Sequence, residues 1–150
     1  MNDMERQKFL DDVRRILRKG RSQTFSFVCS ELKALEDRYN WVGIYVRDGD
    51  KLVLESYKGE KTQHEQISLG DGLCSLAVLK NEIVNEADVK SNAKYLACFP
   101  STESELVVPI RKNGSAVGEI DIDSDTRNAF SLADEKFITD VADLLGAEFF

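Results

Sequence analysis

The chain has 150 residues, of which 42% are hydrophobic and 31% charged, and its formal net charge is −7. These values predict one globular domain spanning residues 1–150, and they exclude a disordered chain. The acidic balance argues against nucleic acid as a partner, because phosphate binding requires clustered Lys and Arg, and no apolar run is long enough for a membrane span.

Two amphipathic helices are predicted in the first 35 residues. The first begins after a cap at Asn2 or Asp3 and ends at Gly20, and its apolar residues share one face: Phe9, Leu10, Val13, Ile16 and Leu17. The second begins at Ser22 and carries an apolar stripe that contains Cys29. We interpret Cys29 as a buried structural thiol.

Strands dominate the middle of the sequence. Residues 41–46 and 52–57 are predicted to pair through an Asp48-Gly49 turn, followed by a third strand at 65–69. A tight turn, Gly70-Asp71-Gly72, then leads to Cys74 and a short helix over 75–80. Ile83-Val84 forms a short strand, and residues 87–104 form a long polar loop, a length typical of functional or disordered segments.

The final hairpin gives the clearest local signal. Residues 106–111 and 116–123 are predicted strands joined by an Asn113-Gly114 turn. A last helix begins at Ser131, where Asp134 stands at the capping-box position. This order of elements predicts an α+β fold, in which N-terminal and C-terminal helices pack on one face of an antiparallel sheet.

Acidic residues alternate along the last predicted strand. Glu119, Asp121 and Asp123 share one face of it, and the tight turn can bring Glu105 opposite them. Such a face is either solvated, as on a half-exposed strand, or confined. Confined carboxyl groups repel one another, so they hold a cation or share a proton.

The other two cysteines lie in segments suited to chemistry. Cys74 precedes a helix N-terminus, which lowers a thiol pKa, although a small apolar filler is an alternative interpretation. Cys98 lies in the long loop, where function and a structural role are equally supported. An odd number of cysteines and a polar, acidic N-terminus favour a reducing compartment, so we expect a cytoplasmic protein in which any disulfide is transient.

Two common kinds of site lack their residues. The chain has one histidine, His64, and no Cys-x-x-Cys pair, so we expect no metal site. A Ser-His-Asp triad would depend on the same histidine, and no Gly-x-Ser-x-Gly elbow is present.

Four segments carry a family resemblance. Residues 40–45 read NWVGIY and residues 70–74 read GDGLC. Ala97-Cys98 is followed at residues 104–109 by SELVVP. Residues 117–124 read VGEIDIDS, which is similar to the strand Gly-Val-Leu-Asp-Ile-Asp-Ser of one enzyme family. With this spacing the chain resembles the GAF-domain free methionine-(R)-sulfoxide reductases, in their two-cysteine subgroup, from about residue 40 to the C-terminus. The resemblance implies the GAF fold.

Three positions depart from the family pattern. His64 stands where many relatives have a further cysteine, Ser75 where Gly is usual, and Phe99 where Asp is usual. The loss of the upstream cysteine leaves Cys74 alone as a resolving thiol. Whether His64 takes over any role of that cysteine is left open by the sequence.

The resemblance implies that the chain reduces free L-methionine-(R)-sulfoxide. Cys98 would be the nucleophile and Cys74 the resolving thiol, with a thioredoxin-type dithiol as reductant and no other cofactor. The remaining site residues would bind substrate. Glu105, Asp121 and Asp123 would share a proton and hold the ammonium group of the substrate. Trp41 and Tyr45 would form an apolar wall of the binding site. A homodimer through the terminal helices is implied by the resemblance alone. The alternative is a GAF module that binds a small ligand and signals without catalysis.

Overall fold

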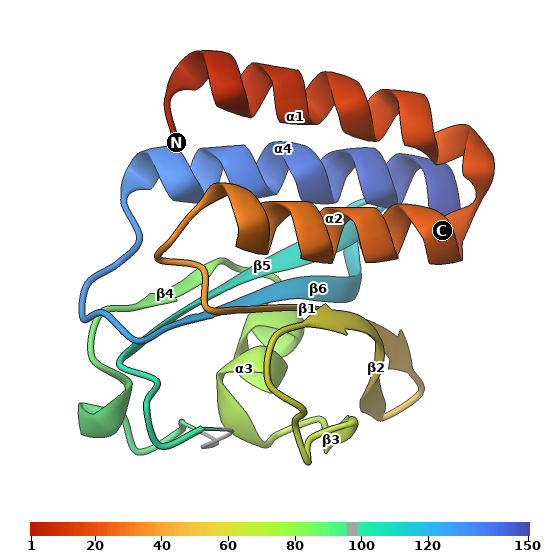
Figure 1. Ribbon diagram of the computed structural model, residues 1–150. Helices are drawn as coiled ribbons and strands as arrows, with labels where there is room; N and C mark the ends of the chain where they lie inside the picture. The colour runs from red at the N-terminus through yellow and green to blue at the C-terminus, as the bar shows by residue number, and fades with distance from the viewer. Residues whose placement is uncertain (96–98) are drawn as a thin grey trace.

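The computed structural model describes residues 1–95 and 99–150, and in this part of the chain a six-stranded antiparallel sheet forms the centre (Figure 1). The strand order is β3-β2-β1-β6-β5-β4. The bounds are β1 (Trp41–Asp48), β2 (Lys51–Lys58), β3 (Gln66–Ser68), β4 (Val84–Glu86), β5 (Ser104–Lys112) and β6 (Ser115–Ser124). Antiparallel pairing joins every neighbouring pair, which confirms the predicted α+β sheet.

Three helices cover one face of the sheet, as predicted (Figure 1). They are α1 (Asp3–Ile16), α2 (Arg21–Leu35) and α4 (Leu132–Phe149). α2 and α4 pack against the sheet, and α1 packs on the outside of these two helices, where its Phe9 contacts Phe27 and Phe137. Phe25 of α2 joins the same apolar core, to which β1, β5 and β6 contribute their inward side chains. A capping box starts α1, in which Asn2 accepts from the Glu5 N–H and Glu5 accepts from the Asn2 N–H.

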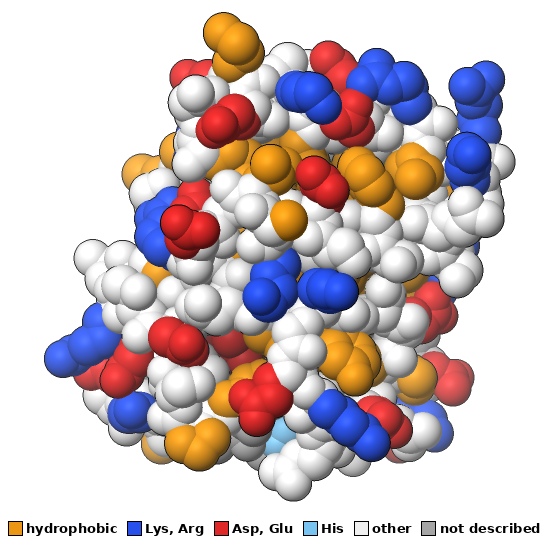
Figure 2. Space-filling view, viewed as in Figure 1, with side chains coloured by type: hydrophobic (Ala, Val, Ile, Leu, Met, Phe, Trp, Pro, Cys, Tyr) orange, Lys and Arg blue, Asp and Glu red, His pale blue; other side chains and the backbone are white. Residues whose placement is uncertain are grey.

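The outer surface of this helical layer is charged. Lys8 pairs with Asp12, and Arg14 pairs with Asp11, at helical spacings of four and three residues. Figure 2 shows acidic and basic side chains interspersed over the visible face. No helix in the described ranges combines the length and apolarity that a membrane crossing requires.

The opposite face of the sheet is covered by α3 (Gly72–Lys80), with a second apolar cluster between them (Figure 1). The sequence predicts a helix only from residue 75, whereas the structure starts it at Gly72. Leu73 and Cys74 are buried against the sheet, so tertiary packing stabilises a first turn whose glycine disfavours helix. Cys74 therefore lies inside the helix instead of ahead of it.

The loop and hairpin that follow largely match the prediction. The described residues of the predicted loop over 87–104 include a short 3₁₀ turn, Val89–Ser91, and β5 begins two residues earlier than expected, at Ser104. The β5–β6 turn has positive φ at both Asn113 (52°) and Gly114 (80°), as a type I′ turn requires. This turn fixes the register that aligns the two strands carrying acidic residues.

Candidate active site

Four acidic side chains gather on the α3 side of the sheet, and we call them the acid face. Glu119, Asp121 and Asp123 follow one another on β6 with relative exposures of 0%, 2% and 3%. Ile120 and Ile122 point to the opposite, helical core because side chains alternate along a strand. Glu105 on β5 pairs with Asp123 and is 6% exposed. The acids are thus confined and not solvated.

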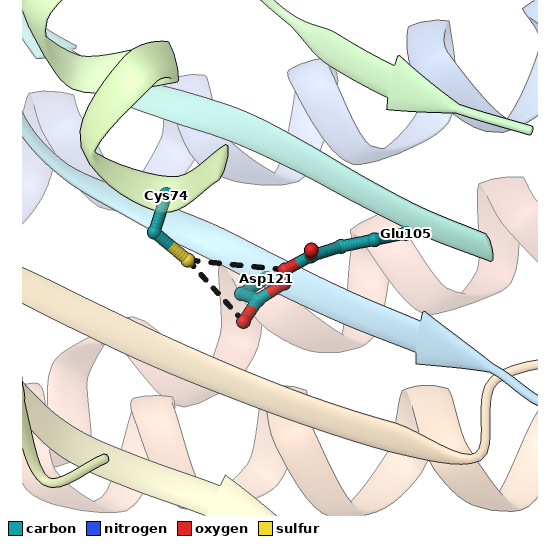
Figure 3. Close-up of side chains that lie close together, drawn as sticks. All are labelled: Cys74, Glu105 and Asp121. Carbon is teal, nitrogen blue, oxygen red and sulfur yellow. Dashed lines mark hydrogen bonds between the residues drawn. The ribbon is translucent and has the colours of Figure 1, made fainter. Parts of the chain in front are cut away.

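Cys74 projects from α3 onto the acid face (Figure 3). Its Sγ atom lies 3.4 Å from Oδ2 of Asp121 and 3.9 Å from Oε2 of Glu105. The side chain is 5% exposed and belongs to the second apolar cluster. One buried thiol therefore contacts carboxyl groups from two neighbouring strands.

The pKa of Cys74 contradicts the expectation that its helix terminus favours a thiolate. Burial raises the pKa of the thiol well above its ordinary value, and the charges of Asp121, Glu119 and Glu105 raise it further. A nine-residue helix whose N-cap, Asp71, makes no side-chain capping bond does not overcome these effects. Cys74 is therefore a protonated thiol at rest.

Three carboxyl groups of the acid face have raised pKa values. Burial raises the pKa of Glu119, Asp121 and Asp123, and the charge of Asp121 raises the pKa of its two neighbours on the strand further. Hydrogen bonding to Glu105 acts in the opposite direction on the pKa of Asp121 and Asp123. Carboxyl groups whose pKa is raised in this way are suited to donate a proton to a substrate.

Several oxygens of the acid face have no hydrogen-bond partner among the described residues. These are both carboxyl oxygens of Glu119, one of Asp121 and one of Asp123. The same three side chains make no ion pair with Lys, Arg or His in residues 1–95 and 99–150. Buried polar atoms without partners are costly, so a cationic or proton-donating ligand would be well accommodated there.

Trp41 lies at the Asp123 end of the acid face. It pairs with Asp123 across β1 and β6, and its indole N–H donates to the Glu60 carbonyl at 3.0 Å. The ring lies over Gly43, where a Cβ atom would come within 2.3 Å of it. Glycine at this position therefore allows the indole to lie flat against the sheet beside Asp121, the residue that pairs with Gly43.

Tyr45 lies at the other end, opposite Glu119. It is fully buried, and its hydroxyl donates to the His64 carbonyl at 2.7 Å. His64 thus contributes a backbone acceptor here, and its own N–H donates to Thr62 Oγ1 at 3.0 Å. The two predicted wall residues therefore flank the acid face at opposite ends.

A small cavity of about 70 Å³ opens beside Asp123, with Trp41, Phe99 and Thr102 among its lining residues. This volume is well below the roughly 300–1,000 Å³ of typical small-molecule sites. The Trp41 ring packs on Tyr57 with centroids 5.8 Å apart and lies 6.2 Å from the Phe99 ring. An amino acid can reach the acid face by this route only if aromatic side chains move.

Cys98, the predicted nucleophile, lies outside the described residues. Its neighbours in the described ranges, Tyr95 and Phe99, both pack with the second cluster, to which Cys74 belongs. Cys29 is far from this chemistry, in the helical core, and burial raises its pKa to about 12.

Glu119 was absent from the predicted set of site residues. Alternation along the strand had already placed it on the face of Asp121, and this was the available signal. It stands where the similar family strand has Val, so the resemblance pointed away from it. Its effect on the pKa of Cys74 depends on the position of α3, which sequence pattern does not give.

Comparison with known proteins points in one direction. A family model described as "GAF domain" matches residues 19–147. The free methionine-R-sulfoxide reductase of Escherichia coli K12 is 30% identical over 89% of this chain and 84% of that protein. A type II free methionine-R-sulfoxide reductase from Thermoplasma acidophilum is 57% identical, with a TM-score of 0.83 over 88% of this chain and 93% of that one. The Neisseria meningitidis free methionine-R-sulfoxide reductase, solved with its substrate, is 26% identical with a TM-score of 0.89 over 96% and 87%.

Proposed function

The chain belongs to the GAF-domain family of free methionine-R-sulfoxide reductases, and we propose that it reduces free methionine-(R)-sulfoxide through a cycle of two thiols. The observation that carries the mechanism is the Cys74 thiol seated 3.4 Å from Asp121 on a buried acid face. A thiol and proton-holding carboxyl groups are the two components that sulfoxide reduction requires.

Substrate recognition would begin with the α-ammonium group. Asp121, Asp123 and Glu105 offer a buried negative site, and a cation offsets their mutual repulsion. A methionine sulfoxide inside a peptide has no such ammonium group. The preference for the free amino acid therefore follows from charge, while Trp41 and Tyr45 would bound the apolar side chain.

The first chemical step is assigned to Cys98. Its thiolate attacks the sulfoxide sulfur, and a protonated carboxyl group of the acid face delivers a proton to the sulfoxide oxygen. The substrate is reduced to methionine, and Cys98 takes the oxygen and becomes a sulfenic acid. The packing of Tyr95 and Phe99 with the cluster of Cys74 supports a meeting of the two sulfurs.

The second step is assigned to Cys74. Its sulfur forms a bond with the Cys98 sulfur, and the sulfenic hydroxyl leaves as water with the thiol proton. The raised pKa of Cys74 supports this division of labour, because a protonated thiol is a poor first nucleophile. The carboxyl group that gave its proton in the first step is then a carboxylate, and it can take the Cys74 proton and pass it to the leaving hydroxyl. A thioredoxin-type dithiol then reduces the disulfide, which suits a protein of the reducing cytoplasm.

A homodimer through the terminal helices is also proposed. Met4 near the start of α1 and Leu132 at the start of α4 are 82% and 80% exposed, which supports contact with another surface. Sedimentation velocity would show a dimer that Met4→Glu and Leu132→Glu weaken. A monomer at all concentrations would contradict the proposal.

The reductase mechanism is tested by NADPH oxidation coupled through thioredoxin reductase and thioredoxin. We expect turnover of the R epimer of free methionine sulfoxide, and none of the S epimer or of an N-blocked derivative. Cys98→Ser should abolish methionine formation, whereas Cys74→Ser should release methionine in a single turnover and then stall. Cys29→Ser is the matched control and should retain full activity.

Sustained turnover by Cys98→Ser would refute its role as nucleophile. If the wild-type chain binds cyclic nucleotides and reduces no sulfoxide, it is a ligand-binding GAF module instead.

A further inference from the structure

We propose that Cys74, Glu105 and Asp121 form a binding site for a thiophilic divalent cation of the Zn²⁺ class. The three side chains come from α3, β5 and β6 and converge on one point (Figure 3). One ligand atom from each lies within 4.8 Å of the others, and all three residues are buried. The single histidine and the absence of a Cys-x-x-Cys pair gave no indication of such a site in the sequence.

The distances match those between ligands of a tetrahedral zinc ion. With Zn–S near 2.3 Å and Zn–O near 2.0 Å, a tetrahedral angle separates sulfur from oxygen by about 3.5 Å. The Cys74 Sγ atom lies 3.4 Å from one carboxyl oxygen and 3.9 Å from the other. Both sulfur–oxygen distances are therefore within a few tenths of an ångström of the separation that a bound zinc ion requires.

The donor set selects the class of metal. A thiolate and two carboxylates suit Zn²⁺ or Cd²⁺, while Mg²⁺ and Ca²⁺ require oxygen donors throughout. Three protein ligands leave a fourth position for water.

A second observation points independently to a cation. Glu119 is fully buried on the same face, two residues from Asp121, and neither of its oxygens has a hydrogen-bond partner among the described residues. Alternation along β6 directs its carboxyl group to the side of the sheet on which the three ligands lie. The second oxygen of Asp121 also lacks a partner. A divalent ion would compensate this negative charge.

Occupancy has a consequence that depends on the proposed reductase function. The ion would hold Cys74 as a metal-bound thiolate and would occupy the carboxyl groups assigned to the substrate ammonium. It would therefore inhibit turnover, and disulfide formation by Cys74 would eject it. Only the reduced protein would bind metal.

The binding test uses Cd²⁺ with the reduced full-length chain and does not depend on activity. Thiolate coordination should produce an ultraviolet charge-transfer band that saturates at one equivalent, and Zn²⁺ should displace it. Cys74→Ser should abolish the band, while Asp121→Asn and Glu119→Gln should weaken binding about tenfold or more. Cys29→Ser and Cys98→Ser are controls that should keep the band, and circular dichroism verifies that each variant folds.

The proposal is overturned if the wild-type chain gives no band, or if the band survives in folded Cys74→Ser. Loss of the band in Cys98→Ser with retention in Cys74→Ser would also overturn it, because the thiolate would then be the wrong one. Zn²⁺ inhibition of sulfoxide turnover is measured separately. A saturable Cd²⁺ band without any reductase activity would leave the metal site intact and refute only the proposed function.

Discussion

Glu119 is fully buried on the acid face, and neither of its carboxyl oxygens has a hydrogen-bond partner among the described residues. Burial of an unpaired polar group is unfavourable even when it is protonated. Its neighbours Cys74 and Asp121 belong to the proposed catalytic site. Glu119 is therefore kept next to that site although none of the described residues gives it a hydrogen bond that would stabilise the fold. Glu119 is therefore a residue at which stability and site chemistry conflict.

Replacing Glu119 with leucine should stabilise the fold. Leucine has a similar volume and fills the same space without a polar group, so we expect the free energy of unfolding to rise by about 1–3 kcal/mol. Urea denaturation monitored by far-ultraviolet circular dichroism measures this change. The control Glu148→Leu, at an exposed position of α4, should stay within about 0.5 kcal/mol. A destabilised Glu119→Leu would mean that the carboxyl group makes a favourable interaction in the native state.

At the scale of elements, the end of α2 depends on one carboxylate. Glu36 is the C-cap of this helix, where the helix dipole disfavours negative charge. Arg38 compensates through a hydrogen bond of 3.1 Å, and the N-terminal ammonium adds another of 3.0 Å. Arg38 also donates to the Ala129 carbonyl, so the pair joins α2 to the segment before α4.

This arrangement predicts an acid-dependent loss of stability. Hydrogen bonding from Arg38 lowers the pKa of Glu36 from its ordinary value to about 2. A lowered folded-state pKa stabilises the protein above the unfolded pKa near 4.5, and this stabilisation is lost as pH falls towards 2. We expect the free energy of unfolding of the wild type to exceed that of Glu36→Gln by up to about 3 kcal/mol at pH 6. This difference should disappear near pH 2.

Urea unfolding of both proteins across this pH range provides the measurement. The difference between their free energies of unfolding reports on Glu36 alone, because the buried acids of β6 are present in both proteins. A gap that is independent of pH would show that Glu36 acts through packing and not through its charge.

Local patterns in the sequence predicted the elements well where local chemistry decides them. The Asn113-Gly114 turn and strand alternation correctly predicted that Asp123 and Glu105 would face each other. The start of α3 was wrong by three residues, because burial of Leu73 and Cys74 outweighs the turn propensity of Gly72. The contact between Cys74 and Asp121 joins residues 47 positions apart, and it depends on packing between layers.

At the scale of the whole molecule, the sheet separates two tasks. One face packs against α2 and α4, with α1 outside them, and contributes the apolar core. The other carries the acid face beneath α3 (Figure 1). Because β6 lies in the middle of the sheet, with β1 and β5 on either side, its acids are fixed by strands that the helical core already holds rigid. Apolar packing on one side therefore preorganises charge on the other.

The side of the sheet with the acid face must nevertheless open to admit a ligand, and Trp41 can report this. The cavity beside Asp123 is small, about 70 Å³, and Trp41 and Phe99 line it. Trp41 is the single tryptophan of the chain. Substrate binding should therefore displace or contact its ring and change the intrinsic fluorescence.

Stopped-flow fluorescence with the Cys98→Ser variant separates binding from turnover. Free methionine-(R)-sulfoxide should produce a saturable change in emission, and the N-blocked derivative should produce none, since it lacks the ammonium group that Asp121 and Asp123 would hold. Gly43→Ala should weaken the response, because a Cβ at 2.3 Å from the indole forces the ring off the sheet. Calorimetric binding of the sulfoxide without any change in Trp41 emission would show that the substrate reaches the acid face by a path that does not involve this aromatic wall.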